Sequence, residues 1–152
     1  MQNTYTFENY QVNKNNEFAY SAAKAVVKLL GTAYNPLFIY GKSDTGKTHL
    51  LYAIRNELSR NRKDVKVYYN TSENAIDECI NHKQNLDVFL IDNFRFFSGK
   101  YEIQGELINI FKYLLENNKQ IVISSDTELS ELDILEDLKN QINMGLLADI
   151  YN

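Results

Sequence analysis

The feature that most constrains the fold is the segment at residues 41–48, which reads GKSDTGKT. It matches the pattern GxxxxGK[ST], in which a loop wraps around phosphate oxygens between a strand and a helix. The flanking residues suit those two elements. The apolar run LFIY lies between Pro36 and Gly41, and residues 47–62 place Leu50, Leu51, Ile54 and Leu58 on one helical face. We therefore expect an α/β protein organised around a strand, a phosphate-binding loop (P-loop) and a helix.

Apolar strands and amphipathic helices alternate along the rest of the chain. The predicted further strands are residues 65–69, 87–92, 120–125 and 146–151. The predicted further helices are residues 18–30, 72–82, 101–117 and 131–142. The inward face of the first helix is expected to hold Phe18, Ala22, Val26, Leu29 and Leu30. This alternation predicts an α/β domain with a parallel sheet and right-handed crossovers.

The bulk properties of the chain narrow the class of protein. Its 152 residues suffice for one domain, here expected to span residues 1–152. The net charge of −4 argues against a surface that grips nucleic acid mainly by neutralising phosphates. The single Cys79, the absence of a signal-peptide pattern and the lack of an apolar run of about 20 residues predict a cytoplasmic protein without a membrane segment.

All eight loop residues are candidate phosphate ligands: Gly41, Lys42, Ser43, Asp44, Thr45, Gly46, Lys47 and Thr48. The two glycines let the backbone approach phosphate oxygens, and the helix N-terminus attracts anions. We expect Lys47 to reach the terminal phosphates and the Thr48 hydroxyl to join a Mg²⁺ shell. Asp44 brings a carboxylate into the loop, which opposes phosphate unless its side chain points outward. The alternative is a tight strand-to-helix turn that binds nothing.

Acidic side chains follow two other predicted strands. Asp92 ends the apolar run VFLID, and Asp126 follows the strand at 120–125. Because ligands gather at the carboxyl ends of parallel strands, we expect Gly41, Asp92 and Asp126 to converge on one crevice. Beside a P-loop, Asp92 is a candidate metal ligand; the alternative is a strand-end acid that caps a loop.

Several segments together resemble the AAA+ ATPase domain of the DnaA family of bacterial replication initiators. They are YTFENY (5–10), AYNPLFIYG (33–41), GKTHLLYAI (46–54), DVFLID (87–92), NNKQIVISSD (117–126), LED (135–137) and GLLADI (145–150). The resemblance implies a P-loop NTPase core of AAA+ type, with a five-stranded parallel sheet flanked by helices. It also implies an ATP or ADP site with Mg²⁺, and a place in replication initiation or its control.

The resemblance implies roles for further residues. The segment from Phe7 to Asn16, with Phe7, Tyr10, Val12 and Asn16, contacts the adenine side of the nucleotide. Thr48 and Asp92 hold the metal, and Asp126 is the sensor beside the γ-phosphate. The implied partner is full-length DnaA or another AAA+ replication protein, with direct DNA binding weak or absent.

Departures from the family pattern affect hydrolysis most. Asn93 stands where the family has a second acid, and an amide positions water without accepting its proton. Residues 138–144 contain no arginine, whereas the family places there an arginine that reaches a neighbouring subunit. The region 70–86 is about one helix shorter than in the family, which carries there an insertion that contacts single-stranded DNA. The chain ends at Asn152, where a helical lid begins in the family. These departures predict a nucleotide binder with impaired hydrolysis that acts through protein contacts.

Three alternatives remain open on the sequence alone. The chain is a minimal ATPase stimulated by a partner, a truncated and non-functional remnant, or a single-stranded DNA-binding module. The aromatic run NFRFF at residues 93–97 is a candidate interaction surface, although most other aromatic residues fit core positions.

Overall fold

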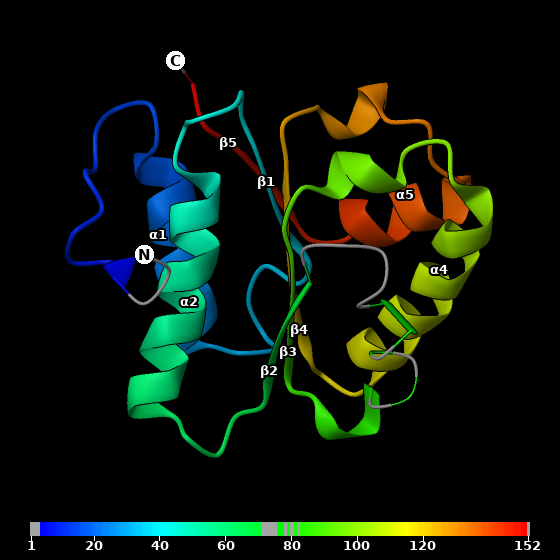
Figure 1. Ribbon diagram of the computed structural model, residues 1–152, viewed down its shortest axis with the longest axis horizontal. Helices are drawn as coiled ribbons and strands as arrows, with labels where there is room; N and C mark the ends of the chain where they lie inside the picture. The colour runs from blue at the N-terminus through cyan, green and yellow to red at the C-terminus, as the bar shows by residue number, and fades with distance from the viewer. Residues whose placement is uncertain (1–3, 71–75, 78, 80, 82, 152) are drawn as a thin grey trace.

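The computed structural model describes residues 4–70, 76, 77, 79, 81 and 83–151. These residues contain a five-stranded parallel sheet in the order β2-β3-β4-β1-β5. Its strands are β1 (Leu37–Tyr40), β2 (Val67–Asn70), β3 (Val88–Ile91), β4 (Gln120–Ser125) and β5 (Leu146–Asp149). Helices α1 (Glu17–Lys28) and α2 (Lys47–Asn61) cover one face, and α4 (Tyr101–Glu116) and α5 (Glu136–Asn143) cover the other (Figure 1). The predicted α/β fold with five parallel strands is confirmed.

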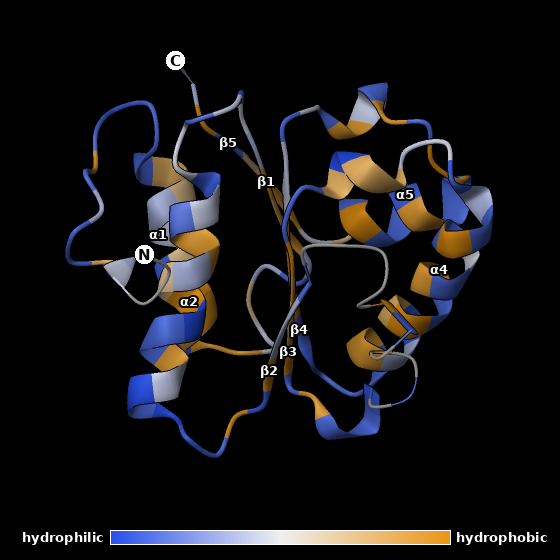
Figure 2. Cartoon of the chain, in the orientation of Figure 1, coloured by the Kyte–Doolittle hydropathy of each residue, from blue (hydrophilic) through white to orange (hydrophobic). Residues whose placement is uncertain are grey.

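The central strands are apolar throughout because both of their faces are buried. In β3, Val88 and Leu90 join the core beneath α1 and α2, whereas Phe89 and Ile91 join the core beneath α4 and α5. Figure 2 shows hydrophobic residues concentrated in the sheet and along the helix faces turned towards it. The continuous apolar run in the sequence is thus the pattern expected of a doubly covered parallel strand.

The prediction for the first helix is wrong in part. Its buried face is built from small residues, Ala19, Ala22, Ala23 and Val26. Phe18 is 53% exposed and Leu29 is 52% exposed. Both therefore lie outside the core, although the helical spacing predicted them to lie inside it. Leu29 is the C-cap of α1, which ends at Lys28, before the position that the sequence predicted. Small residues at this interface let α1 approach its neighbours closely. The sequence prediction relied on the spacing of large apolar residues and therefore missed part of this buried face.

The helix predicted at 131–142 starts too early. Residues 129–131 form a short 3-10 helix, η4 (Leu129–Glu131), and α5 begins only at Glu136. The buried side chain of Gln104 explains the difference. Its Nε2 donates to the carbonyl of Asp133 at 3.0 Å, and its Oε1 accepts from the backbone N–H of Leu135 at 2.8 Å. These bonds satisfy backbone groups of residues 133–135, which lie between η4 and α5 and have no helical partners there.

Three smaller predictions concern the chain between and around these elements. The helix predicted at 72–82 falls mostly outside the described residues, although Cys79 is buried as expected. The run at 93–97 includes another 3-10 helix, η3 (Phe94–Phe97), in which Phe94 and Phe97 are core residues and Phe96 is 37% exposed. Within the described part of the chain, no helix is long and apolar enough to cross a membrane.

Candidate functional site

The P-loop connects the carboxyl end of β1 to the first turn of α2, and two different requirements explain its glycines. Gly46 has φ 93°, a left-handed conformation, and a Cβ there would lie 3.0 Å from the Tyr10 hydroxyl. At Gly41 a Cβ would lie 2.9 Å from the carbonyl oxygen of Ile150, so close packing excludes a side chain there. Asp44 also has a positive φ, 64°, and its exposed side chain lines the hollow over Lys47 and Thr48.

The ammonium group of Lys47 lies inside the curve of the loop. It donates to the carbonyl oxygens of Gly41 and Lys42, and Thr45 Oγ1 lies 3.3 Å away. Burial lowers the pKa of Lys47, and the carboxylates of Asp126, Asp92 and Asp44 act in the opposite direction. Because Lys47 also begins α2, its charge lies beside the positive end of the helix. This arrangement places a cation and free helix-end amides where a phosphate chain would bind.

Asp92 receives three hydroxyl donors at the carboxyl end of β3. Thr48 Oγ1 and the Tyr69 hydroxyl each lie 2.9 Å from Asp92 Oδ2. Ser124 Oγ donates to Asp92 Oδ1. The three donors come from α2, β2 and β4, so the carboxylate is fixed by elements on every side. A carboxylate held in this way cannot rotate freely, which prepares it to orient a bound ion.

The residues around Asp92 fit a Mg²⁺ ion. A threonine hydroxyl and a carboxylate are hard oxygen ligands, and here they lie within hydrogen-bond distance of each other. The described residues hold no group of three or more His, Cys, Asp or Glu side chains that would enclose a metal. Mg²⁺ commonly binds one or two protein oxygens and takes its remaining ligands from phosphates and water, so two ligands suffice.

Asn93 follows Asp92 in a left-handed conformation with φ 61°. Its backbone N–H donates to Ser124 Oγ at 3.0 Å, and its side chain is exposed. Asparagine and aspartate both tolerate this conformation, so the turn alone does not select the amide. Residues 138–144 form most of α5 and its C-cap, where Lys139 is the cationic side chain. Two of the predicted departures, Asn93 and the lack of an arginine in residues 138–144, therefore lie at the end of β3 and on α5.

Asp126 lies at the end of β4, and its carboxylate contacts Arg95. Arg95 Nε lies 3.3 Å from Asp126 Oδ1, and the Thr127 hydroxyl lies 3.0 Å from the same oxygen. The sequence singled out neither Arg95 nor Tyr69 as a site residue. Tyr69 lies near the end of β2, one position before Asn70, which pairs with Ile91. The rule that ligands gather at the carboxyl ends of parallel strands, applied to every strand, would have identified it.

The four predicted adenine-side residues lie in different environments. Tyr10 packs against the P-loop, and its hydroxyl is buried without a hydrogen-bond partner among the described residues. Burial raises the pKa of Tyr10 to about 12. Asn16 is buried, and its side-chain Oδ1 accepts a hydrogen bond of 2.8 Å from the backbone N–H of Asn13 in the same turn. Phe7 packs in the core and lines a separate cavity with Lys24 and Lys28, whereas Val12 is 46% exposed.

Two hollows border the P-loop. One, of about 340 Å³, is lined by Tyr5, Asp44, Gly46, Lys47, Thr48 and His49. His49 stacks on Tyr5 with ring centroids 4.7 Å apart, and its Nε2 lies 2.7 Å from the carbonyl oxygen of Thr6. The imidazole is thereby tied to the N-terminal segment, which agrees with a packing role rather than a catalytic one.

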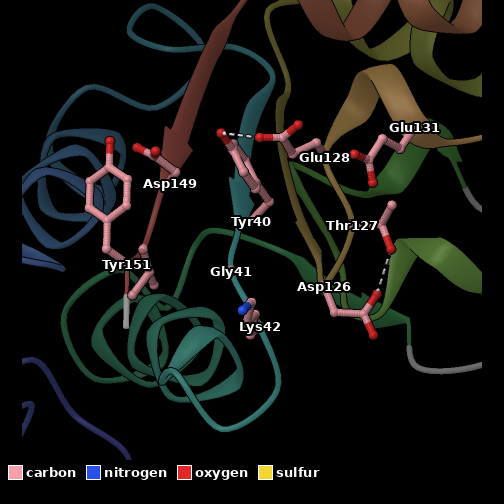
Figure 3. A pocket seen from close by; sticks show the side chains of 10 residues that line it. Tyr40, Gly41, Lys42, Asp126, Thr127, Glu128, Glu131, Asp149 and Tyr151 are labelled. Carbon is pink, nitrogen blue, oxygen red and sulfur yellow. Dashed lines mark hydrogen bonds between the residues drawn. The ribbon is translucent and has the colours of Figure 1, made fainter.

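The second hollow, of about 540 Å³, lies between the ends of β4, β1 and β5 (Figure 3). Four carboxylates line it, those of Asp126, Glu128, Glu131 and Asp149. Burial raises the pKa of Tyr40 to about 12, with smaller contributions from Asp149 and Glu128. This concentration of negative charge opposes a polyphosphate. The smaller hollow over Lys47 and Thr48, which one carboxylate (Asp44) lines, is therefore the candidate phosphate-binding surface, although the acidic hollow is larger.

Comparisons with known proteins identify the arrangement. Residues 1–149 match the profile of the bacterial DnaA ATPase domain. Domain III of the Thermotoga maritima replication initiation protein DnaA is 39% identical, with a TM-score of 0.88 over 96% of this chain and 66% of that one. DnaA from Aquifex aeolicus with AMPPCP bound is 33% identical, with a TM-score of 0.86 over 96% of this chain and 49% of that one. The chain therefore spans about half to two thirds of these relatives.

A structure of the DnaC helicase loader shares the fold at 18% identity, with a TM-score of 0.70 over 95% of this chain and 96% of that one. That likeness shows the fold alone. The family profile covers nearly the whole sequence, and the relatives above 30% identity align along almost all of it. The chain belongs to the bacterial DnaA ATPase-domain family, with an α/β core of AAA+ type.

Proposed function

We propose that this chain, as a single domain over residues 1–152, binds ATP or ADP together with Mg²⁺ and acts in replication initiation or its regulation. One observation carries the proposal: Lys47 lies inside the P-loop while Thr48, the next residue, contacts Asp92 at 2.9 Å. A phosphate site and a metal site are thus adjacent. The Aquifex aeolicus relative was solved with AMPPCP bound, which supports nucleotide binding by this chain.

Each part of the site has a distinct task in this proposal. The P-loop amides and Lys47 bind the phosphate chain, and Tyr10 lies where the N-terminal segment meets the loop. Thr48 and Asp92 hold Mg²⁺, which when bound neutralises phosphate charge. Tyr69 and Ser124 fix the orientation of the Asp92 carboxylate. Asp126 lies close enough to Lys47 to affect its pKa, which suits a sensor of the terminal phosphate.

We further propose that hydrolysis is slow or absent. A carboxylate after Asp92 would accept a proton from the attacking water, and Asn93 supplies an amide instead. No arginine lies on α5, and Lys139 lacks the planar fork with which arginine binds phosphate. General-base catalysis and an arginine finger are each worth about 10²-fold or more in rate. A site that lacks both retains affinity and loses turnover.

The partner in this proposal is full-length DnaA or another AAA+ replication protein. Without an arginine on α5, the chain accepts an arginine from a neighbour and offers none in return. It would therefore end a filament of AAA+ subunits and limit its growth. The net charge of −4 favours protein contact over direct DNA binding.

Calorimetric titration with ATP–Mg²⁺ and with ADP–Mg²⁺ tests the binding step. The proposal expects saturable binding of one nucleotide per chain and affinity about 100-fold weaker in Lys47→Ala. A pull-down of full-length DnaA with the tagged chain, with and without ATP, tests the partner. Failure to retain DnaA in either condition, together with unchanged origin unwinding, would leave the regulatory role without support.

The same samples address the alternatives. Reversible melting that shifts upward with ATP–Mg²⁺ excludes a non-functional remnant. A salt-sensitive gel shift with single-stranded DNA would instead favour the DNA-binding module.

A further inference from the structure

Arg95 lies at the phosphate end of the sheet, three residues after Asp92. Its neighbours on η3, Phe94 and Phe97, are 0% and 2% exposed, so the short helix is anchored in the core. The Arg95 side chain is 62% exposed, and its Nε lies 3.3 Å from Asp126 Oδ1. Arg95 therefore has a fixed backbone and a side chain free to exchange partners.

Asp126 connects Arg95 with the P-loop. The start of the P-loop meets the end of β4 here, because the Gly41 N–H donates to the carbonyl of Ser125 at 3.1 Å. Asp126 lines the same hollow as Gly41 and Lys42, so its carboxylate joins Arg95 to the edge of the P-loop. A γ-phosphate bound beside Lys47 would compete with the Asp126 carboxylate for the guanidinium of Arg95.

The other arginines are placed differently. Arg55 lies on α2 with its guanidinium 4.5 Å from the centre of the Tyr52 ring. Arg60 and Arg62, at the far end of α2 from the P-loop, pair with Glu8 and Asp64. In the part of the chain that the structure describes, Arg95 is the arginine at the carboxyl ends of the strands.

We propose that Arg95 makes this site distinguish ATP from ADP, by leaving Asp126 and donating to the γ-phosphate of a nucleotide bound to the same chain. The inference rests on the proposed nucleotide binding. The Arg95 side of the ion pair is 62% exposed and the Asp126 side is 24% exposed, so solvent screens the pair in part and lowers the cost of exchanging it. A phosphate accepts both arms of the guanidinium fork, which makes it the stronger partner. ADP lacks the γ-phosphate, and Arg95 then stays with Asp126.

The test compares the affinities of a non-hydrolysable ATP analogue and of ADP, each with Mg²⁺, by calorimetry. The variants are Arg95→Gln and Arg95→Lys, and Arg62→Gln is a matched control. Arg62 also places its Nε 3.3 Å from an aspartate Oδ1, and its side chain is 51% exposed. Melting temperatures without nucleotide show whether each variant folds as the wild type does.

The expected result is that Arg95→Gln weakens the ATP analogue about tenfold and leaves ADP within about twofold. Arg95→Lys is expected to be intermediate because it keeps the charge and loses the fork. Arg62→Gln is expected to match the wild type for both nucleotides. Equal losses for the two nucleotides in Arg95→Gln, or no loss for either, would overturn the assignment. A wild-type chain that binds neither nucleotide would instead refute the proposed function itself.

Discussion

Two halves of the candidate site differ in the side chains that they hold. Around Asp92, three hydroxyl groups from three elements converge on one carboxylate, and Lys47 is enclosed by its own loop. One residue further along, the Asn93 side chain is exposed, and α5 presents no arginine. In our proposal, the first half supplies the groups that bind phosphate and metal. The second half lacks a general base beside the attacking water and an arginine that α5 could offer to a neighbouring subunit.

The comparison indicates that nucleotide binding and nucleotide hydrolysis depend on different groups of the site. Binding depends on backbone shape and on fixed charges, which the P-loop and the end of β3 provide. In our proposal, hydrolysis depends on a general base beside the attacking water and on an arginine from a neighbouring subunit. The following predictions alter one half at a time, beginning with the largest expected effect.

Lys47→Ala removes the cation of the binding half. We expect nucleotide affinity to fall about 100-fold, because several charge-assisted hydrogen bonds are lost together. Calorimetric titration measures the change, with Lys112→Ala on exposed α4 surface as the control. Unaltered affinity in Lys47→Ala would mean that the P-loop is a structural turn only.

Asn93→Asp restores a carboxylate to the hydrolysing half. The backbone at this position has φ 61°, which aspartate tolerates, so the fold is expected to persist. We expect phosphate release to rise about tenfold over wild type while nucleotide affinity changes little. Measurement of both on one preparation separates the halves. A rise in affinity without any rise in release would show that Asn93 belongs to the binding half.

Tyr69→Phe removes one of the three donors to Asp92 and keeps the ring that stacks on Tyr52 at 4.3 Å. We expect the Mg²⁺ concentration for half-maximal nucleotide binding to rise about threefold, because the carboxylate is less firmly oriented. Binding without Mg²⁺ should not change.

Tyr68→Phe is the matched control for that variant, because Tyr68 lies next to Tyr69 on β2 and packs against the opposite core. An equal loss in both variants would indicate general damage to the strand rather than an effect on Asp92.

The pKa of Lys47 gives the smallest predicted effect. Burial lowers that pKa, whereas a bound phosphate chain raises it, so binding takes up a proton once the free lysine begins to titrate. Nucleotide affinity should therefore fall as pH rises through the lowered pKa of the free protein. Titrations from neutral pH upward measure this. Lys47→Arg, which stays charged, should abolish the dependence.

The sequence predicted the layers of the fold well because its signals are local. A P-loop pattern, doubly buried strands and helical periodicity each follow from a few adjacent residues. The errors arose where distant residues decide the outcome. Gln104 holds residues 133–135 extended, and small residues rather than Phe18 and Leu29 form the buried face of α1.

The same distinction applies to the site. Asp92 and Thr48 could be paired from the motif and from the topology of a parallel sheet. The same topology would have placed Tyr69 at this edge of the sheet, but its contact with Asp92 depends on how β2 meets β3. The contact of Arg95 depends on how η3 meets the end of β4, and no local pattern marks an arginine for such a role.

The central claim is that this chain binds nucleotide and metal without efficient hydrolysis. The most direct test is calorimetric titration with ATP–Mg²⁺ followed by measurement of phosphate release from the same sample. Our account predicts saturable binding with phosphate release no faster than from Lys47→Ala. Saturable binding accompanied by sustained release well above that variant, from the wild-type chain alone, would contradict it.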